Sequence, residues 1–564
     1  MKIVCLVKQV PRPDAIEFDE ETKTLKRAGV PLVLNPFDRA AVAMAADLGG
    51  EVVAMTMGPP QAEEALRETL ATGATRGVHL SDRVFAVADT LGTSRTLAMA
   101  LEKEGFDLVL CGRKTVDSET WQVPPEVAAF LGVPHVTNVS RIEGVDGRVR
   151  VVRETDTGEQ TFEFEPPAIL SVAHAQPEPR DTTEGQIDVW TAQDLVSDLR
   201  PNDKRFGQTG SPTRVLAVRD VTPERAAVHV GTAEDAVNEI RRLLADRPAP
   251  TTSWEKPDHI AEHPAASYDC WTLVELFDGR PTRHSLELVA RGRELAGKLG
   301  GRNVALVAGH GVEEPVREVV RHGAEVVVDV DDAQLARYQP EVWAAALRQV
   351  VERERPHVLL IPASAFGRDL GPRIAGELGL GMTGDCVAVD IAKAGRLLQT
   401  KPAYGGNIVS VIMGATTPQL ATVRARMYEP LGPREDAQAE VRHFRLEGLP
   451  EPRLRLVDES RRSSGLELDA AEVVVVAGPD AGLDLDALPR SGAVVATTGE
   501  VGLYGRPVAP RVLISVGLDG TPEQLSGFVK AAVVTAAGGA APWADVSVDG
   551  DPRELVPQLI DALP

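Results

Sequence analysis

The sequence predicts an α/β protein with two related open parallel-sheet domains, followed by a smaller third domain of the same class. Short β-branched runs alternate with amphipathic helical patterns through residues 1–200, which is typical of a parallel sheet covered by helices. The alternation restarts near residue 271, and the layout of residues 106–132 recurs around residues 362–373. The final hundred residues again follow a β-α-β pattern.

The two copies are related by matching residues at a constant spacing. The matches are Arg67 with Arg317, Glu68 with Glu318, Gly73 with Gly323, Ala74 with Ala324 and Leu110 with Leu360. Solenoid repeats are only about 20–50 residues long. So long a spacing therefore indicates two copies of one whole α/β domain in a single polypeptide.

Each expected element follows from its local pattern. In the first copy the β-branched runs predict strands, and the periodic segments predict helices. The strands are Lys2–Val7, Glu51–Thr56, Gly77–Leu80 and Leu108–Cys111, and the helices are Arg39–Leu48, Glu63–Thr72 and Thr93–Lys103. The closely spaced runs Arg148–Arg153, Gln160–Phe164 and Ala168–Val172 are expected to be antiparallel additions. In the last domain, strands are expected at Val473–Ala477, Ala493–Ala496, Val512–Val516 and Ala531–Ala536.

Changes in composition divide the chain into units. Residues 1–247 form the first unit, residues 248–267 a Pro-rich exposed linker, and residues 268–434 the second unit. A charged stretch at 435–464 precedes the last domain at 465–564.

Bulk composition excludes several classes of protein. A net charge of −23 argues against nucleic-acid binding, which needs a basic surface. No apolar run approaches the roughly 20 residues that span a bilayer. The N-terminus resembles a buried strand rather than a signal peptide, so we expect a cytoplasmic protein. The four cysteines lack CxxC spacing and are expected to be buried, reduced thiols: Cys5, Cys111, Cys270 and Cys386.

The candidate site lies in the loops that follow the strands of the first copy, because ligands of open α/β sheets bind at the carboxyl ends of the strands. These loops supply helix-start N–H groups, hydroxyls and carboxylates, a set that suits the phosphate and ribose of an adenine nucleotide. The candidate residues are Leu6, Lys8, Asn35, Asp38, Met57, Gly58, Asp89, Thr90, Thr93, Gly112, Lys114, Asp117, Thr120, Gln122 and Val123. For Asp38, Asp89 and Thr93, a role as ordinary helix caps is an equal alternative.

Ordered motifs give the chain a family resemblance. In the first half they are Val7-Lys8-Gln9-Val10-Pro11, Asn35-Pro36-Phe37-Asp38, Gly73-Ala74, Gly112…Asp117…Thr120-Trp-Gln122-Val123 and Gly210-Ser-Pro-Thr-Arg-Val215. In the second half they are residues 363–373, Thr383-Gly-Asp385, Lys401-Pro-Ala-Tyr-Gly-Gly-Asn407 and Ala421-Thr-Val-Arg424. The first half resembles the beta subunit of electron transfer flavoproteins, and the second half resembles the alpha subunit. The chain is thus similar to a beta–alpha fusion.

The resemblance implies two nucleotide-binding-type domains as a base and a C-terminal, Rossmann-like domain that carries FAD. It implies AMP or a second FAD in the first half. The form of the loop from Asp117 to Val123 resembles the electron-bifurcating members, which hold that second FAD, somewhat more than the AMP-only members. It also implies that residues 198–213 dock a flavin-dependent or other dehydrogenase, and that the fused halves form a pseudo-heterodimer within one chain.

The C-terminal domain departs from the family pattern where the flavin would bind. The family's Ser-Gly-x-x-Gln-His becomes Asp519-Gly-Thr-Pro-Glu523-Gln524, and its Gly-Gln-Thr-Gly becomes Gly502-Leu-Tyr-Gly505. Gln524 donates a hydrogen bond but carries no charge, while Asp519 adds negative charge beside an anionic reduced flavin. The family-equivalent FAD residues here are Gly502, Tyr504, Gly505, Arg506, Gly517, Gly520 and Gln524. The glycines also have a plain structural role in tight turns.

Two functional hypotheses follow. The first is an electron carrier that accepts electrons from a dehydrogenase and passes them to an acceptor such as a quinone reductase. The second is a redox-inactive paralogue that binds AMP or ADP and serves as a scaffold. Trp121, which replaces a small residue in the first-half loop, could stack on a cofactor ring or fill the pocket. A hydrolase is a weaker third idea, since the sequence shows no Ser-His-Asp order, Walker loop or metal cluster.

Overall fold

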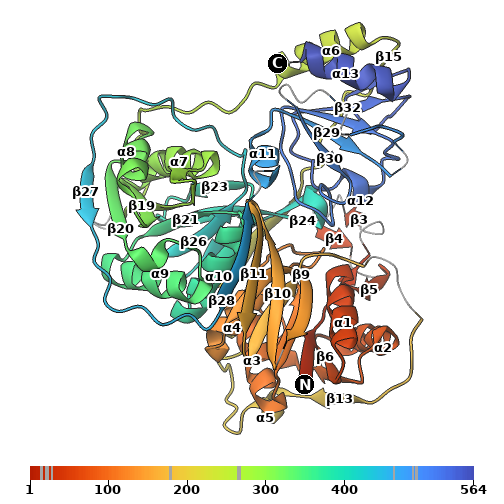
Figure 1. The fold of residues 1–564 in the computed structure, drawn as a ribbon, viewed down its shortest axis with the longest axis vertical. Helices are drawn as coiled ribbons and strands as arrows, with labels where there is room; N and C mark the ends of the chain where they lie inside the picture. Colours follow the sequence, from red (N-terminus) through yellow and green to blue (C-terminus); the bar gives the residue numbers. More distant parts are fainter. Residues whose placement is uncertain are drawn as a thin grey trace.

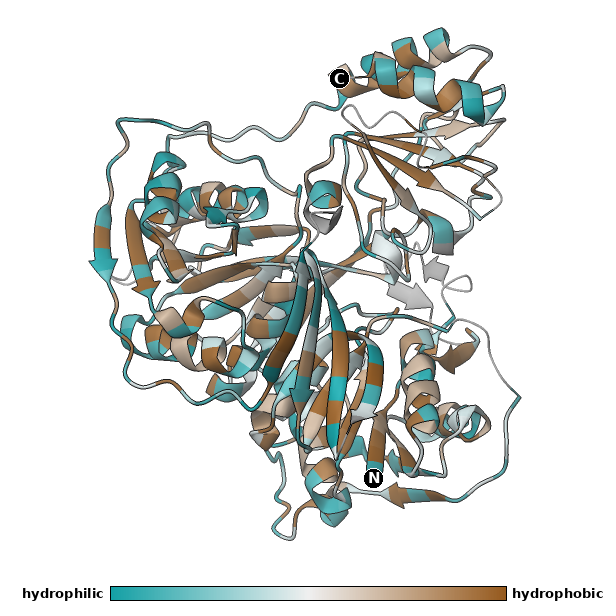
Figure 2. Cartoon of the chain, in the orientation of Figure 1, coloured by the Kyte–Doolittle hydropathy of each residue, from teal (hydrophilic) through white to brown (hydrophobic). Residues whose placement is uncertain are grey.

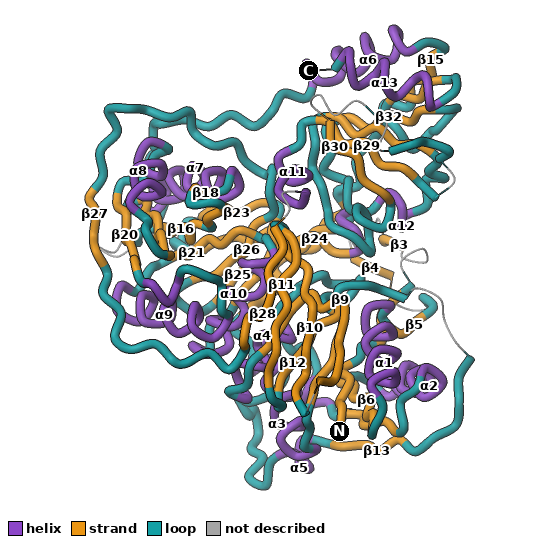
Figure 3. Tube along the Cα trace, viewed as in Figure 1, coloured by secondary structure: helices purple, strands orange, loops and turns teal. Residues whose placement is uncertain are grey.

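A computed structural model describes residues 1–12, 17–19, 24–26, 29–145, 147–176, 181–262, 268–461, 464–479, 481–485, 488 and 493–563. The chain forms three α/β bodies, each with parallel strands inside and helices outside (Figures 1 and 3). We call them the first, second and C-terminal domains. They confirm the expectation of an α/β protein with several parallel sheets.

The first domain is built on a ten-stranded sheet. Its strand order is β13 (Ile187–Trp190), β7 (Arg76–Leu80), β6 (Glu51–Met57), β1 (Lys2–Leu6), β8 (Leu108–Gly112), β12 (Ala168–Val172), β9 (His135–Val145), β10 (Arg148–Thr155), β11 (Gly158–Phe164) and β28 (Arg455–Arg461). The helices of this domain are α1 (Pro36–Leu48), α2 (Glu63–Thr72), α3 (Thr90–Glu104), α4 (Val123–Leu131) and the short α5 (Ala192–Leu195).

The second domain repeats this order in a seven-stranded sheet. The strands are β22 (Met382–Cys386), β26 (Gln419–Val423), β21 (Val358–Pro362), β16 (Cys270–Val274), β19 (Asn303–Gly309), β20 (Val326–Asp331) and β27 (Glu440–His443). The helices are α7 (Arg283–Leu299), α8 (Glu313–Arg321), α9 (Pro340–Glu354) and α10 (Ala365–Leu378). From β7 to β9 and from β20 to β22 the equivalent strands occur in the same order, which confirms the predicted duplication.

One predicted strand pairs differently. Residues Ala168–Val172 were expected to be antiparallel, but β12 lies parallel to both β8 and β9. Its five residues are all buried, as a strand covered on both faces requires. Closeness in sequence to β10 and β11, which are antiparallel, misled the prediction.

The two base domains exchange strands. In the four-stranded sheet β14-β25-β24-β23, β14 (Thr213–Asp220) comes from the first half and pairs with β25 (Ile408–Gly414) of the second. That sheet continues with β24 (Leu397–Ala403) and β23 (Ala388–Ile391). In return, β28 from the later charged stretch pairs with β11 of the first domain. Residues 435–464, expected to be a linker, therefore supply both β27 and β28.

The C-terminal domain is also completed by the first half. Its sheet runs β15 (Val228–Val230), β33 (Val546–Val548), β32 (Val533–Ala537), β31 (Val512–Val516), β29 (Val473–Ala477) and β30 (Ala493–Thr497). Its helices are α6 (Ala233–Asp246), α11 (Ser464–Ala470), α12 (Pro522–Leu525) and α13 (Pro552–Ala562). Residues 228–246 thus pack with this domain, although the sequence-based boundary at 247 places them in the first.

Buried apolar side chains form the cores of the three domains. Figure 2 shows the strands of the sheets as largely hydrophobic. Shorter pieces are β2 (Gln9–Pro11), β3 (Glu17–Asp19), β4 (Thr24–Lys26), β5 (Leu32–Leu34), β17 (Leu276–Phe277) and β18 (Arg280–Pro281). The four cysteines are buried and unpaired, as expected. Among the described helices none is long and apolar enough to cross a membrane.

The segment after α6 runs along the surface of the second domain. Thr252 donates its hydroxyl to the Pro430 carbonyl at 3.3 Å, and Trp254 donates Nε1–H to the Gly432 carbonyl at 3.1 Å. The Trp254 ring lies beneath the Arg434 guanidinium at 4.4 Å. Only residues 248–251 therefore connect α6 to this docked segment, and they contain Pro248 and Pro250.

Candidate functional site

The carboxyl ends of β1 and β8 are joined by Asp38. Its carboxylate accepts the backbone N–H of Lys8 at 2.9 Å and that of Gly112 at 2.9 Å. A Cβ at Gly112 would lie 2.5 Å from Asp38 Oδ1, so only glycine permits this approach. Burial raises the pKa of Asp38 to about 7, although these hydrogen bonds oppose the shift. Asp38 therefore fixes the crevice rather than capping a helix.

The loop after β8 is held from both sides. Lys8 Nζ pairs with Asp117 at 2.6 Å, and the Asn35 side chain bonds the backbone of Lys114 and Val116 at 3.0 and 3.2 Å. Lys114 Nζ lies 3.3 Å from the Glu119 carboxylate, and burial lowers the pKa of Lys114 to about 8. These contacts bring six of the predicted residues together: Lys8, Asn35, Asp38, Gly112, Lys114 and Asp117.

A second group of predicted residues gathers between α3 and α4. Asp89 caps α3 by accepting the Gly92 N–H at 2.9 Å, as the capping alternative predicted, and its other oxygen accepts from Thr213. The Thr90 hydroxyl donates to Gln122 Oε1 at 2.5 Å. Gln122 in turn donates to the Met382 carbonyl at 3.2 Å, which ties the loop to the second domain.

The remaining predicted residues lie at the ends of β1 and β6, in α3, and at the start of α4 and the loop before it. Thr93 lies in the first turn of α3, its N–H bonded to the Asp89 carbonyl. Leu6 is buried at the end of β1, whereas Met57, Gly58, Thr120 and Val123 are half-buried.

The backbone of this loop fits a phosphate group. Trp121 has a φ of +63° and is followed by Gln122 in a right-handed conformation (φ −93°), an alternation that makes neighbouring N–H groups converge on an anion. Pro124 and Pro125 in the first turn of α4 carry no N–H, which removes two of the donors a helix start normally offers. This donor set suits the single phosphate of AMP better than a diphosphate.

Trp121 lies at the junction of the domains rather than in the crevice. Its ring is stacked between cations, with Arg113 at 5.0 Å and Arg368 of the second domain at 4.5 Å from the ring centroid. The ring is buried, and its Nε1 has no hydrogen-bond partner. Both alternatives for Trp121, stacking on a cofactor ring and filling the pocket, stay predictions.

The family-equivalent residues of the C-terminal domain are largely occupied by internal contacts. Arg506 forms ion pairs with Asp156 of the first domain and, at 3.4 Å, with Asp469. Gln524 Oε1 accepts the Asp519 N–H at 2.7 Å. The Tyr504 carbonyl accepts from Arg113 at 2.8 Å, so this loop is docked on the first domain.

The glycines of this domain are required by its backbone. Gly517 and Gly520 have φ values of +67° and +80°, and a Cβ at Gly520 would lie 2.2 Å from the Trp543 ring. Gly502 has a φ of +128°, and a Cβ at Gly505 would lie 2.3 Å from the Glu500 carbonyl oxygen. Their structural role is thus sufficient to explain them.

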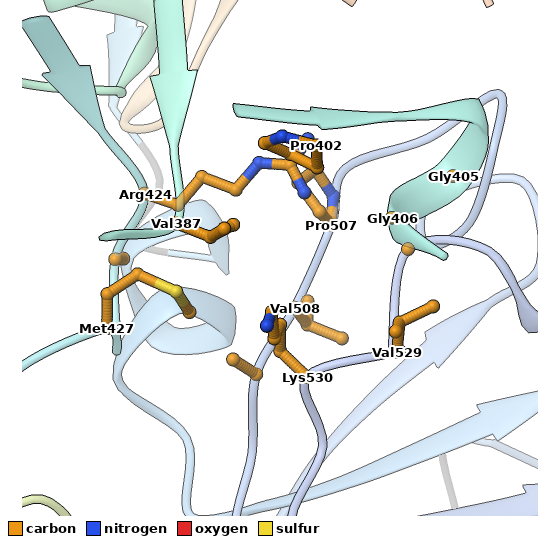
Figure 4. Close-up of a pocket in the computed structure, with 13 residues that line it drawn as sticks. Val387, Pro402, Gly405, Gly406, Arg424, Met427, Pro507, Val508, Val529 and Lys530 are labelled. Carbon is orange, nitrogen blue, oxygen red and sulfur yellow. The ribbon is translucent and has the colours of Figure 1, made fainter. Parts of the chain in front are cut away.

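Two adjoining cavities lie in the seam between the second and C-terminal domains, with about 350 and 380 Å³ of space that is partly open to solvent. The first, the seam cavity (Figure 4), is lined by glycines and apolar side chains, and its charged lining residues are Arg424 and Lys530. The second is lined by Arg368, Arg426 and Arg506 and also by the two acids that pair with Arg506, Asp156 and Asp469.

These cavities supply what the loops of the C-terminal sheet lack. Among the described residues of the loops that follow β30 and β31, Glu500 and Asp519 are acidic. The cations there are Arg506, which is ion-paired, and Arg511, which donates to the Arg247 carbonyl at 2.7 Å. The positive and apolar lining of the seam cavity fits the flavin end of FAD, which is aromatic and becomes anionic on reduction. Lys530 could not be found from the sequence, because only the fold brings it to the same cavity as Arg424.

Known proteins match the first and second halves of the chain separately. A family profile described as electron transfer flavoprotein domain matches residues 22–195 and 270–448. The chain belongs to the electron transfer flavoprotein family. The beta subunit of Thermoanaerobacterium thermosaccharolyticum is 36% identical over 257 residues, 44% of this chain and 99% of that protein. The alpha subunit of Clostridium acetobutylicum is 32% identical over 323 residues, 51% of this chain and 95% of that protein.

A third relative carries a partner in its name. The caffeyl-CoA reductase-Etf complex subunit CarD of Acetobacterium woodii is 37% identical over 261 residues, 44% of this chain and 97% of that protein. One polypeptide therefore contains regions similar to nearly the whole of both subunits, which bears out the resemblance seen in the sequence.

Proposed function

We propose that this protein is a single-chain electron carrier, which accepts electrons from a dehydrogenase and passes them to a downstream acceptor such as a quinone reductase. The observation that carries the proposal is that regions similar to almost complete alpha and beta subunits fold against one another in one chain. The C-terminal sheet is completed by β15 from the beta-like half, so both halves contribute to the body beside the seam cavities.

The chemistry would come from FAD, which accepts and releases electrons when it is bound. The chain's own residues bind, orient and shield it. The seam cavity supplies cationic and apolar walls, and the first-half loop offers converging N–H groups for AMP or a second FAD. The donor set at α4 favours AMP there.

Partner docking is proposed for residues 198–213. Within this segment Arg205 pairs with Asp203 at 2.6 Å and with Asp198 at 2.9 Å, while the Phe206 ring packs on Phe85 at 5.4 Å. These contacts hold an exposed loop in one shape, which reduces the entropy that docking would otherwise cost. The complex named for CarD supports an oxidoreductase as the partner.

The test is a visible absorption spectrum of the purified chain after reconstitution with excess FAD, followed by chromatography of the nucleotides released on denaturation. We expect a yellow protein that is bleached by reduction, with about one FAD and one AMP per chain. Asp117→Asn should lower the AMP content and leave the FAD content unchanged.

A redox-inactive, nucleotide-binding scaffold is the second candidate. It is favoured by the Arg506 ion pairs and by Asp519 and Glu500, which leave little free positive charge in the described loops that follow β30 and β31. A colourless protein that contains AMP and takes up no FAD would establish the scaffold and reject the electron carrier.

A further inference from the structure

The seam cavity has an uneven charge. Arg424 enters it from the end of β26 and Lys530 from the loop before β32, and none of its described lining residues is a carboxylate (Figure 4). Lys530 makes no hydrogen bond or ion pair within the part of the chain that the structure describes. Two cations with no acid between them repel each other, and a bound anion would relieve this repulsion.

The groups behind Arg424 do not cancel this charge. Arg424 Nε lies 3.2 Å from Asp385 and Nη2 lies 3.4 Å from Glu119, but each carboxylate is shared with other cations. Asp385 also pairs with Arg368 at 2.8 Å, and Glu119 with Lys114 at 3.3 Å.

The cluster behind Arg424 holds more cations than acids. Its cations are Lys114, Arg368, Lys401 and Arg424, and its acids are Glu119 and Asp385. Arg368 is also attracted by Asp156 and Asp469, which pair with Arg506, so the wider group has five cations and four acids. Lys530 adds a further cation at the rim. The repulsion is felt at Lys530, since burial and the Arg424 charge both lower the pKa of its ammonium group.

The rest of the lining suits a flat apolar group. Val508, Met427 and Val529 face the space, and Gly405 and Gly406 leave their side of it free of side chains. The two cations therefore stand at the edge of an apolar slot rather than on an open surface.

We propose that Arg424 and Lys530 are the cationic pair of this cofactor site, which binds the edge of the flavin of FAD that becomes negative on reduction. The identity of the ligand rests on the function proposed above. The pair supplies the positive charge that the altered residues around Gln524 do not. Arg424 comes from the second domain and Lys530 from the C-terminal domain, so the site is complete only when the two are docked.

Lys530→Gln is the decisive variant, because Lys530 has no ion-pair partner among the described residues and its loss leaves no acid unpaired. Arg424 is unsuitable, since its removal would leave Asp385 and Glu119 less neutralised in the interior. Lys530→Arg keeps the charge. Arg553→Gln removes an equal charge from α13, which lies away from the seam (Figure 1).

The measurements are the Kd for FAD, by titration, and the midpoint potential of the bound cofactor, by spectroelectrochemistry. Loss of a charge-assisted contact is worth at least about tenfold in affinity. We expect Lys530→Gln to raise the Kd for FAD by that factor. It should also lower the midpoint potential, because the anionic reduced flavin loses more stabilisation than the neutral oxidised flavin. Lys530→Arg and Arg553→Gln should stay within about twofold of wild type.

The outcomes separate the two proposals. If wild type binds FAD and Lys530→Gln behaves like Arg553→Gln, the inference is overturned and the electron carrier stands. If wild type takes up no FAD, both fall together. A weakened Kd with an unchanged midpoint potential would also overturn the inference, because the pair would then not distinguish the reduced form.

Discussion

At the scale of single residues, Asp369 shows how the two base domains are held together. It is fully buried and accepts hydrogen bonds from Tyr338 at 2.5 Å and from Thr137 of the first domain at 2.6 Å. Arg153, also of the first domain, lies 3.4 Å from its carboxylate. Removing this charge would leave the Arg153 guanidinium buried beside a neutral group, which typically costs about 3–5 kcal/mol.

We therefore expect Asp369→Asn to lower the free energy of unfolding by about that amount. Thermal unfolding followed by circular dichroism measures it, with Asp458→Asn on the exposed surface of β28 as the control. An Asp369→Asn protein that melts with the control would show that the buried pair contributes nothing net.

The same residue predicts a dependence on pH. The neighbouring His135 and Arg153 hold the pKa of Asp369 well below its usual range. A carboxyl group whose folded-state pKa is depressed contributes stability above its unfolded pKa of about 3.9, and this is lost as the pH falls through the folded-state value. The difference in melting temperature between wild type and Asp369→Asn should therefore shrink between about pH 5 and pH 2. A constant difference across this range would contradict it.

Residue-level prediction from sequence succeeded where chemistry is local. Loops that follow strands led to Asp38, which lies between Lys8 and Gly112, and to Gln122, which lies against Thr90. Their role in binding a nucleotide stays a prediction. Lys530 was not found, because a single lysine after Phe528-Val529 has no distinctive neighbours in sequence. Lys530 matters because it lines the same cavity as Arg424, which is more than a hundred residues away in the sequence.

At the scale of elements, the strands that were predicted are those with apolar, β-branched runs, such as β1, β29 and β31. The exchanged strand β28 was missed because Arg-Leu-Val-Asp-Glu-Ser-Arg has no period-two alternation and is mostly exposed. Such an edge strand is specified by its partner β11, and not by its own pattern.

Helix α6 belongs to the first half in sequence, but it should stabilise the C-terminal domain. Ile240 on this helix is fully buried in the core of the C-terminal domain, among Val533, Val546 and Leu559. Ile240→Ala should cost about 2–5 kcal/mol. Because the cavity lies in that domain, amide hydrogen exchange should accelerate in β32 and β33 and stay unchanged in β1 and β8.

Glu234→Ala is the matched control, an exposed position on the same helix. Faster exchange spread evenly over the first domain would contradict the assignment of α6 to the C-terminal body. The domain boundary predicted at residue 247 could not be improved from the sequence, because the apolar face of a helix does not reveal which sheet it packs against.

At the scale of the whole molecule, the chain keeps the organisation of two subunits. The beta-like half gives β14 to the second domain and β15 with α6 to the C-terminal domain, and the alpha-like half returns β28. These contacts pair backbone groups and bury apolar side chains over all three bodies. The covalent link at residues 248–251 is therefore a small part of what joins the halves.

This predicts that cutting the link leaves the molecule whole. A site for a specific protease inserted between Ala249 and Pro250 lies in an exposed stretch outside any helix or strand, so the uncut variant should melt like wild type. After cleavage, the two fragments should elute together from a size-exclusion column at the position of the uncut chain. High salt should not separate them, because strand pairing and apolar burial are barely screened, unlike exposed ion pairs. Elution as two species in native buffer would show instead that the fusion itself holds the halves together, by keeping their effective concentration high.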